Sequence, residues 1–258
     1  MKNLADFSPD QFEDALEDIL ASRIKCLTVK GDTAPEAILL GGQSGAGKTT
    51  LHKIFKARFA DDVAIINGDE YRSYHPHYHE LFEEYGSDSV KYTASWAGKM
   101  TEALIDSLSS MGYNLVIEGT LRTSEVPLKT AKLLRCKGYD VSLALMAVKP
   151  EISLVSCQIR YELMRLAGTT PRATDPAHHR LIVESIVGNL SVLEESGLFS
   201  SVSLYSRSGE CLYSSQGKEG SASAALKEAL FGSWTAEELF HYEYLCKRLE
   251  SLKEGDAN

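Results

Sequence analysis

The chain has 258 residues, of which 43% are apolar and 24% charged, and its 36 acidic and 27 basic side chains give a formal net charge of −9. This composition is that of an ordinary globular protein, and it excludes a disordered, collagen-like or low-complexity chain. The acidic balance argues against general binding of nucleic acid or of an anionic membrane, because those partners attract a basic surface. A small polyanionic ligand is still possible, since it needs only a few local positive groups.

Cysteine usage and the first residues indicate a cytoplasmic protein. The five cysteines contain no C-x-x-C pair, so neither a zinc site nor a disulfide framework is expected. The sequence begins M-K-N-L-A-D-F without an apolar stretch, so we expect no secretory signal. No apolar stretch approaches the roughly 20 residues that cross a bilayer. We therefore expect a soluble protein of the reducing cytoplasm, with neither membrane nor nucleic acid as a partner.

In chain order, the first predicted element is a helix, and short apolar strands then alternate with helical patterns. The helix starts after Ser8, because Ser8, Pro9 and Gln11 form an N-cap, a first-turn proline and a capping-box partner. A last helix starts at Thr235, where Glu238 completes a capping box and Trp234 can pack on Leu239. Between them, we expect strands over 37–40, 63–67, 114–117, 141–148 and 202–205. The helices expected between the strands cover 49–59, 90–111, 126–137, 151–166 and 177–195.

This alternation predicts an α/β fold in which helices cover both faces of a parallel sheet. Ligands of such sheets gather at the carboxyl ends of the strands. The sequence contains no internal repeat and no long linker. We expect a single domain over 1–258, with an N-terminal helical extension over 1–35, a core over 36–215 and C-terminal helices over 216–258.

The strand at 37–40 runs into G-Q-S-G-A-G-K-T, which matches the phosphate-binding pattern G-x-x-x-x-G-K-[ST] and opens a helix. Glycines let backbone N–H groups surround a phosphate at the positive end of the helix, so an acidic protein can still hold ATP. Lys48 would reach the β- and γ-phosphates, and the Thr49 hydroxyl would bind Mg²⁺. A glycine-rich turn without a ligand is the alternative, but the strand–loop–helix context favours a P-loop kinase-like core. The predicted ATP-binding residues are Gly42, Gln43, Ser44, Gly45, Ala46, Gly47, Lys48, Thr49 and Thr50.

Asp69 follows the second predicted strand, in N-G-D-E-Y-R. In a parallel sheet this position lies beside the phosphate loop, where a carboxylate can accept the proton of an attacking hydroxyl during phosphoryl transfer. The alternative is that Asp69 caps the following helix or orders a loop. Position alone does not separate these interpretations.

The third predicted strand ends in E-G-T-L-R, which places Glu118 on a strand beside that of the phosphate loop. Glu118 could orient Mg²⁺ through water or bind a substrate hydroxyl, and Thr120 and Arg122 add a hydroxyl and a cation. The alternative is a structural ion pair between Glu118 and Arg122.

A basic lid is predicted around the turn-rich stretch 167–174. Arg160 and Arg165 lie on the preceding helix and Arg172 lies in the stretch itself, where arginines could bind phosphate oxygens or else remain solvated. The H-P-H-Y-H run at 75–79 has alternating histidines, but its proline and the missing fourth ligand favour polar loop histidines over a zinc site. No cofactor beyond ATP and Mg²⁺ is expected.

Taken together, these motifs resemble the zeta toxin family, the toxin half of the epsilon/zeta and PezAT toxin–antitoxin systems, and are most similar to its PezT branch. The resemblance runs from about residue 37 to 213. The glycine-rich loop occurs in many P-loop kinases, whereas E-G-T-L-R-T with R-Y-E and R-A-T is more specific.

The resemblance implies an ATP-dependent kinase that phosphorylates the 3′-hydroxyl of the N-acetylglucosamine unit of UDP-N-acetylglucosamine and so blocks peptidoglycan synthesis. It implies that Asp69 is the catalytic base and that Thr49 binds Mg²⁺. The cations that would stabilise the phosphates are Lys48, Arg160 and Arg172. The sugar-nucleotide contacts would come from Arg72, Glu102, Glu118, Thr120 and Arg122.

The resemblance also implies a small helical antitoxin that obstructs the ATP site in a two-plus-two complex. Two other functions remain open from the sequence. The chain could phosphorylate another small alcohol, such as an antibiotic or a nucleoside, or it could be a non-catalytic module that binds a nucleotide and a partner.

Overall fold

A computed structural model describes residues 3–29, 33–169, 171, 173–217 and 219–255. Six strands form one sheet in the order β2-β3-β1-β4-β5-β6, and β1 to β5 run parallel. The strands are β1 Glu36–Gly41, β2 Ala64–Ile66, β3 Leu115–Glu118, β4 Asp140–Met146, β5 Ser201–Tyr205 and β6 Cys211–Ser214. The five predicted strands and their parallel arrangement are confirmed. The antiparallel edge strand β6 was not predicted, because it is only four residues long and half of it is exposed.

Ten α-helices and two short 3₁₀ segments are assigned within the described residues. The helices are α1 Pro9–Ile24, α2 Thr49–Arg58, α3 Tyr78–Tyr85, α4 Ser89–Tyr92, α5 Ala94–Ser110, α6 Glu125–Cys136, α7 Pro150–Leu166, α8 Pro176–Glu195, α9 Ala222–Phe231 and α10 Ala236–Glu254. The 3₁₀ segments are η1 Glu70–Tyr74 and η2 Gly86–Asp88. Every predicted helix exists, α9 lies within the predicted C-terminal helical segment, and α3 was not predicted.

The helix predicted over 90–111 is wrong in one respect, because it is broken at Thr93 between α4 and α5. The guanidinium of Arg72 donates to the carbonyl oxygen of Val90 at 2.8 Å and to Thr93 Oγ1 at 3.0 Å. In a continuous helix, the Val90 carbonyl oxygen would accept a hydrogen bond from the backbone N–H four residues later. Here the side chain of Arg72 takes the place of that donor. A tertiary contact, invisible to local periodicity, therefore ends α4.

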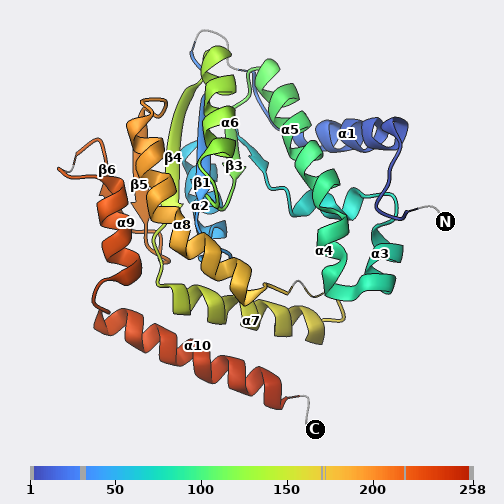
Figure 1. Cartoon of the computed structure of the whole chain (residues 1–258). Helices are drawn as coiled ribbons and strands as arrows, with labels where there is room; N and C mark the ends of the chain where they lie inside the picture. Colours follow the sequence, from blue (N-terminus) through green and yellow to red (C-terminus); the bar gives the residue numbers. More distant parts are fainter. Residues whose placement is uncertain (1–2, 30–32, 170, 172, 218, 256–258) are drawn as a thin grey trace.

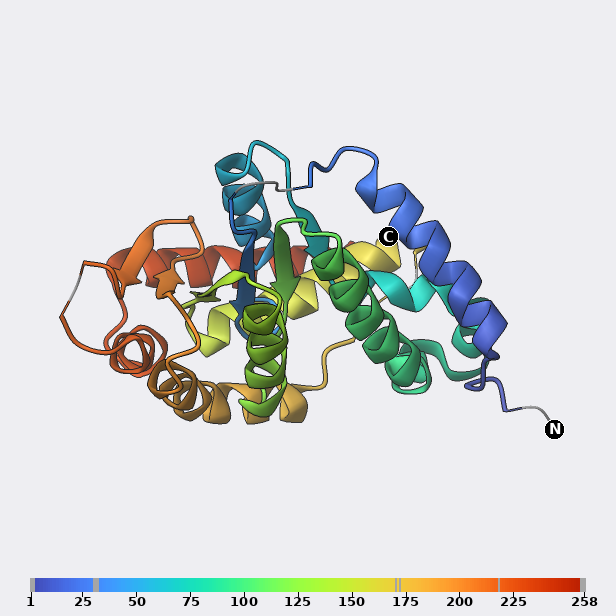
Figure 2. The same ribbon diagram turned by 90° about the horizontal axis from the view of Figure 1, so that it is seen from above.

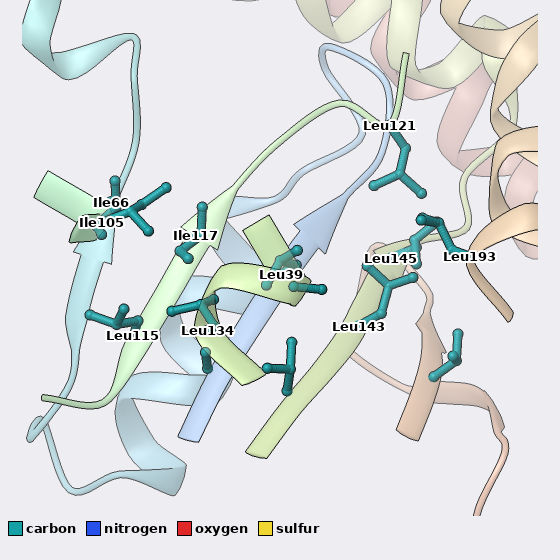
Figure 3. Close-up of a cluster of buried hydrophobic side chains, with 14 of the residues drawn as sticks. Leu39, Ile66, Ile105, Leu115, Ile117, Leu121, Leu134, Leu143, Leu145 and Leu193 are labelled. Atoms are coloured by element: carbon teal, nitrogen blue, oxygen red, sulfur yellow. The ribbon is translucent and has the colours of Figure 1, made fainter. Parts of the chain in front are cut away.

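Helices cover both faces of the sheet, as the sequence predicts (Figures 1 and 2). Alternate residues of β1 point to opposite faces: Ala37 and Leu39 join a core with residues of α1, α5, α6, α8 and α9, and Ile38 and Leu40 join a second core with α2, α7 and α10. Figure 3 shows the first of these cores, with leucines and isoleucines of β1, β3 and β4 meeting those of the covering helices. Among the described residues, no helix has both the length and the apolar character needed to cross a membrane.

The helices at both ends pack on the sheet-bearing core, so we propose that the chain forms one domain. Both predicted capping boxes are present, at Ser8 and at Thr235. The buried side chain of Lys149, just before α7, donates to the carbonyl oxygen of Gly232 in the C-terminal segment at 2.9 Å. Trp234 packs on Tyr242, with ring centroids 5.4 Å apart, whereas its predicted contact Leu239 is 47% exposed.

The N-terminal extension is held by an aromatic cluster around Trp96. The rings of Phe7, Phe12 and His75 meet the Trp96 ring edge-on, with centroids 4.9 to 5.4 Å apart. Trp96 is fully buried, and its Nε1 donates to the Tyr71 carbonyl oxygen at 2.9 Å. His75 lies in the loop between η1 and α3, as predicted, but it is 3% exposed and therefore buried in this cluster.

Trp96→Ala should lower the free energy of unfolding by about 3–5 kcal/mol, because it leaves a large cavity where α1, η1 and α5 meet. Chemical denaturation measures this change. The matched control is Phe240→Ala, which removes an aromatic ring that is 74% exposed and should cost less than about 0.5 kcal/mol. Equal losses for the two variants would contradict the packing described here.

Candidate functional site

The predicted phosphate loop lies between β1 and α2, at the carboxyl end of β1. Gly42, Gly45 and Gly47 have φ angles of +135°, +78° and +93°, which residues with a Cβ rarely adopt. The tightest position is Gly45, where a Cβ would lie 2.0 Å from the carbonyl oxygen of Ser153 and 2.7 Å from the Sγ of Cys157. The loop therefore rests directly on the first turns of α7.

Two buried polar side chains of this loop bind its own backbone and the turn after β4. Gln43 is fully buried and its Nε2 donates to the Val148 carbonyl oxygen at 2.7 Å. Lys48 Nζ donates to the carbonyl oxygens of Gly42 at 2.9 Å and Gln43 at 3.3 Å. Burial lowers the pKa of Lys48 from its ordinary value, while the negative charges of Glu118 and Asp69 act in the opposite direction. The site thus concentrates positive charge at the loop and places two carboxylates around it.

Glu118 ends β3, the strand beside β1, and faces Lys48. Its Oε1 lies 3.7 Å from Lys48 Nζ, and its Oε2 lies 2.8 Å from Nε2 of His52, a residue on α2 that the sequence analysis missed. The partners of Glu118 are therefore Lys48 and His52, not Arg122 as the structural alternative supposed. Burial alone would raise the pKa of Glu118, but the close approach of His52 and the charge of Lys48 outweigh it and hold the pKa below its usual range.

Asp69 lies just beyond β2 and immediately before η1. Its Oδ1 is 3.0 Å from Arg72 Nε, and its carboxylate is half exposed. Asp69 follows the carboxyl end of β2 as the phosphate loop follows that of β1, and its negative charge acts to raise the pKa of Lys48. Asp69 makes no side-chain cap to η1, so the capping alternative is wrong. Arg72 fixes this carboxylate and also contacts Val90 and Thr93.

The N-terminal extension reaches the segment that carries Asp69, which the sequence analysis did not predict. Arg23 of α1 forms an ion pair with Glu70, the residue after Asp69, with Nη2 and Oε2 2.7 Å apart. The Nε2 of His75, at the end of η1, lies 3.4 Å from the carbonyl oxygen of Ala5. The orientation of η1 therefore depends on contacts from outside the predicted core.

The predicted acceptor residues occupy three places, and the first is η1, where Arg72 lies beside Asp69. Thr120 and Arg122 follow Glu118 directly on the loop after β3, with Thr120 half-buried and Arg122 exposed. Glu102 lies apart from them on the surface of α5, where it is 71% exposed and its Oε1 is 3.2 Å from Lys129 Nζ of α6. The structure thus groups Glu118, Thr120 and Arg122, while Glu102 pairs elsewhere.

Of the predicted lid arginines, Arg160 projects from α7, and its Nη2 lies 3.5 Å from Thr174 Oγ1 at the far end of the lid stretch. Arg165 pairs within α7, with Glu162 Oε2 2.8 Å from its Nε. Arg172 lies outside the described residues.

Arg207 is a further basic residue at the loop that the sequence analysis missed. It lies between β5 and β6, and its Nη1 donates to the Gly45 carbonyl oxygen at 2.8 Å, from 162 residues further along the chain. Arg160 and Arg207 line a cavity of about 310 Å³ between α7, α10 and this turn. The rest of the wall is mainly apolar, and its polar exceptions are Ser156, Thr169 and Arg248 of α10. The lining residues include Ile159, Leu163, Met164 and Leu245.

The residues at the loop fit the predicted Mg²⁺. Within the described part of the chain, no three His, Cys, Asp or Glu side chains gather to hold a metal ion by themselves. Mg²⁺ bound with nucleotide phosphates needs only one or two protein oxygens, since water and phosphate supply the others. The hydroxyl of Thr49 and the nearby carboxylates of Glu118 and Asp69 are oxygen donors of this kind.

Comparisons with known proteins identify the family of this chain. A family model described as Zeta toxin matches residues 20–218. The chain belongs to the zeta toxin family. The toxin PezT of Streptococcus pneumoniae serotype 4 (strain ATCC BAA-334 / TIGR4) is 48% identical over 254 residues, which cover 97% of this chain and 99% of that protein. The toxin zeta of Streptococcus pyogenes is 41% identical over 216 residues, 83% of this chain and 75% of that protein.

Solved structures agree with this family assignment. A chain in the structure of the PezAT chromosomal toxin–antitoxin system of Streptococcus pneumoniae has a TM-score of 0.90 and 45% identity, with 98% of this chain and 100% of that chain covered. The AvrRxo1-ORF1:ORF2 complex contains a chain with a TM-score of 0.64 but only 16% identity, and it shares the fold alone. The resemblance to the zeta toxin family and its PezT branch, predicted from the motifs, is confirmed.

The close contact at Gly45 leads to a prediction about the loop. Gly45→Ala should lower the free energy of unfolding by about 2–5 kcal/mol, because the new Cβ collides with the backbone of α7 and its φ is positive. The matched control is Gly98→Ala on the exposed face of α5, where a Cβ meets nothing within 4 Å and should stabilise the helix. Thermal unfolding measures both changes, and a Gly45→Ala protein as stable as the wild type would contradict the geometry.

His179 on α8 leads to a pH-dependent prediction. Its Nε2 lies 2.8 Å from Ser153 Oγ beneath the phosphate loop, and burial lowers the pKa of His179 below its ordinary value. A histidine in the unfolded chain has a pKa of about 6.5. Below that pH, the unfolded chain therefore binds protons more readily than the folded one. The stability contributed by neutral His179 is complete above this pH and is lost as the pH falls toward the lower folded-state pKa.

His179→Gln should therefore lose less unfolding free energy than the wild type between about pH 7 and about pH 5. Denaturant titrations at the two pH values measure the difference. His178→Gln, at the exposed neighbouring position, is the control and should follow the wild type. Identical pH profiles for His179→Gln and the wild type would show that His179 does not contribute.

Proposed function

We propose that the chain is an ATP-dependent kinase that phosphorylates the 3′-hydroxyl of the N-acetylglucosamine unit of UDP-N-acetylglucosamine. The observation that carries this proposal is the convergence of Lys48, Glu118 and Asp69 at the carboxyl edge of the sheet. A phosphate-binding cation and a carboxylate able to take a proton meet there, which are the groups needed to transfer a phosphoryl group to an alcohol. Membership of the zeta toxin family supports the same proposal.

The donor side of the site suits a nucleoside triphosphate. Backbone N–H groups of the glycine-rich loop and the start of α2 face the phosphates, and Lys48 supplies a buried positive charge. The cavity beside Arg160 and Arg207 combines apolar walls with guanidinium groups, which can stack on a base. In this proposal, ATP lies between the phosphate loop and that cavity, and Arg160 and Arg172 stabilise the transferred phosphoryl group.

Bound Mg²⁺ would neutralise charge on the β- and γ-phosphates, held by the Thr49 hydroxyl with Glu118 nearby. Asp69 accepts the proton of the acceptor hydroxyl, and Arg72 keeps its carboxylate in place. Glu118, Thr120 and Arg122 orient the sugar nucleotide on the loop after β3, with Glu102 contributing from α5. The phosphate loop, the segment with Asp69, the loop after β3 and α5 would together align the γ-phosphate with the acceptor hydroxyl.

This activity would consume a precursor of the bacterial cell wall and so block peptidoglycan synthesis from the cytoplasm. The partner in this proposal is a small helical antitoxin that obstructs the ATP site in a two-plus-two complex. The similarity to a chain of the PezAT toxin–antitoxin system supports such a partner.

Incubation of the protein and radiolabelled ATP with separate UDP-sugars, free sugars, antibiotics and nucleosides tests the function. We expect label on UDP-N-acetylglucosamine. Transfer to an antibiotic or nucleoside alone would instead support a kinase for another alcohol. ATP binding without any transfer would support a non-catalytic module.

Asp69→Asn should lower the rate of transfer by about 10²–10⁴-fold, because the amide cannot accept the hydroxyl proton. ATP affinity, measured by calorimetry, should remain within a few-fold of the wild type. Lys48→Ala should instead lose both binding and turnover, and Arg160→Ala chiefly the rate. Asp88→Asn, which changes a surface carboxylate paired with Lys91, is the control. Full activity of Asp69→Asn would rule out Asp69 as the base.

A further inference from the structure

Leu121 has an unusual backbone conformation at the centre of the proposed acceptor loop. Its φ is +54°, and the other non-glycine residues with positive φ in the described chain, Ala60 and Asp61, lie in the turn before β2. The left-handed region is unfavourable for a leucine, because its Cβ approaches the carbonyl oxygen. Such a conformation persists only where surrounding contacts enforce it, and it is often found at functional sites.

The side chain of Leu121 is one of these contacts. It is 5% exposed and lies against β1, where a Cβ at Gly41 would be 2.6 Å from Leu121 Cδ1. Figure 3 shows it in the core near Leu145 of β4 and Leu193 of α8. The side chain is thus anchored inward while the backbone turns, with Thr120 on one side and Arg122 on the other.

The backbone is held by α8. The Nδ2 of Asn189 donates to the carbonyl oxygens of both Leu121 and Arg122, each at 2.8 Å. One turn earlier, the Oγ of Ser185 donates to the Arg122 carbonyl oxygen at 3.2 Å. An asparagine amide has two N–H donors, so a single side chain can bind both carbonyls. The two consecutive peptide groups that directly follow the strained residue are therefore fixed.

From this arrangement, we infer that Asn189 is a positioning residue for acceptor binding. It touches neither phosphate loop nor reacting group, and it acts through the backbone of 121–122. Without it, the loop relaxes toward the favoured extended conformation, and Thr120 and Arg122 turn away from the acceptor. The inference rests on the proposed function, because it assigns a purpose to the geometry of the proposed acceptor loop.

Asn189 holds the loop through the N–H donors of its amide. A variant that keeps its shape but lacks these donors therefore distinguishes this role from simple packing. Asn189→Asp has the same shape but a carboxylate with no donor, and this carboxylate would face two carbonyl oxygens. Ser185→Ala removes only the more distant of the donors to Arg122. Ser191→Ala is a matched control on the same helix, since its Oγ donates to Glu195 Oε1 and not to the loop.

Steady-state kinetics with UDP-N-acetylglucosamine and ATP, each varied in turn, tests this inference on the full chain. We expect Asn189→Asp to raise the acceptor KM by about tenfold or more, which corresponds to about 1.4 kcal/mol, while the KM for ATP stays within about twofold. Ser185→Ala should raise the acceptor KM by about two- to threefold and Ser191→Ala should leave it unchanged. Thermal unfolding checks that each variant is folded.

A wild-type protein that does not phosphorylate UDP-N-acetylglucosamine would overturn the proposed function, and this inference with it. An active wild type whose Asn189→Asp variant keeps its acceptor KM, or changes both KM values equally, would overturn the inference alone. Should Asn189→Asp fail to fold, Ser185→Ala decides the matter, because its acceptor KM must rise selectively.

Discussion

The site depends on one buried cation and the groups that make its burial tolerable. A lysine ammonium removed from water loses its hydration, and this cost must be offset by nearby oxygen atoms. Two backbone carbonyls of the glycine-rich loop and the carboxylate of Glu118 supply those oxygens to Lys48. β3, the strand that carries Glu118, lies beside β1, and the Nε2 of His52 lies 2.8 Å from the other oxygen of that carboxylate. Loop, strand order and neighbouring helix are thus linked through a single charge.

The groups at the site come from two kinds of support. Donor-side groups rest on regular elements, because the phosphate loop joins β1 to α2 and lies on α7. Acceptor-side groups rest on segments that need outside help: η1 is held by Arg23, and the loop after β3 is held by Asn189. In the proposed kinase, this difference separates a common donor from a selected acceptor, since selectivity depends on loops that other parts of the fold hold rigid.

How far the sequence predicts this arrangement depends on the range of the contacts involved. The phosphate loop, Asp69 and Glu118 were placed correctly at one edge, because the carboxyl ends of parallel strands meet there and each strand is visible as a local apolar run. Arg207 reaches Gly45 across 162 residues and Asn189 reaches Leu121 across 68, and no local pattern encodes such pairs. The break at Thr93 has the same origin, since the side chain that causes it lies 21 residues earlier.

The C-terminal segment completes the wall of the cavity beside the phosphate loop, and it is the last part of the chain to be synthesised. Lys149, just before α7, is held by the carbonyl of Gly232, and α10 supplies Leu245 and Arg248 to the cavity beside the phosphate loop. A chain emerging from the ribosome therefore carries its phosphate loop for nearly two hundred residues before the last wall of that cavity exists. If ATP binds beside this cavity as proposed, the nascent chain lacks one wall of its nucleotide site until translation is almost finished.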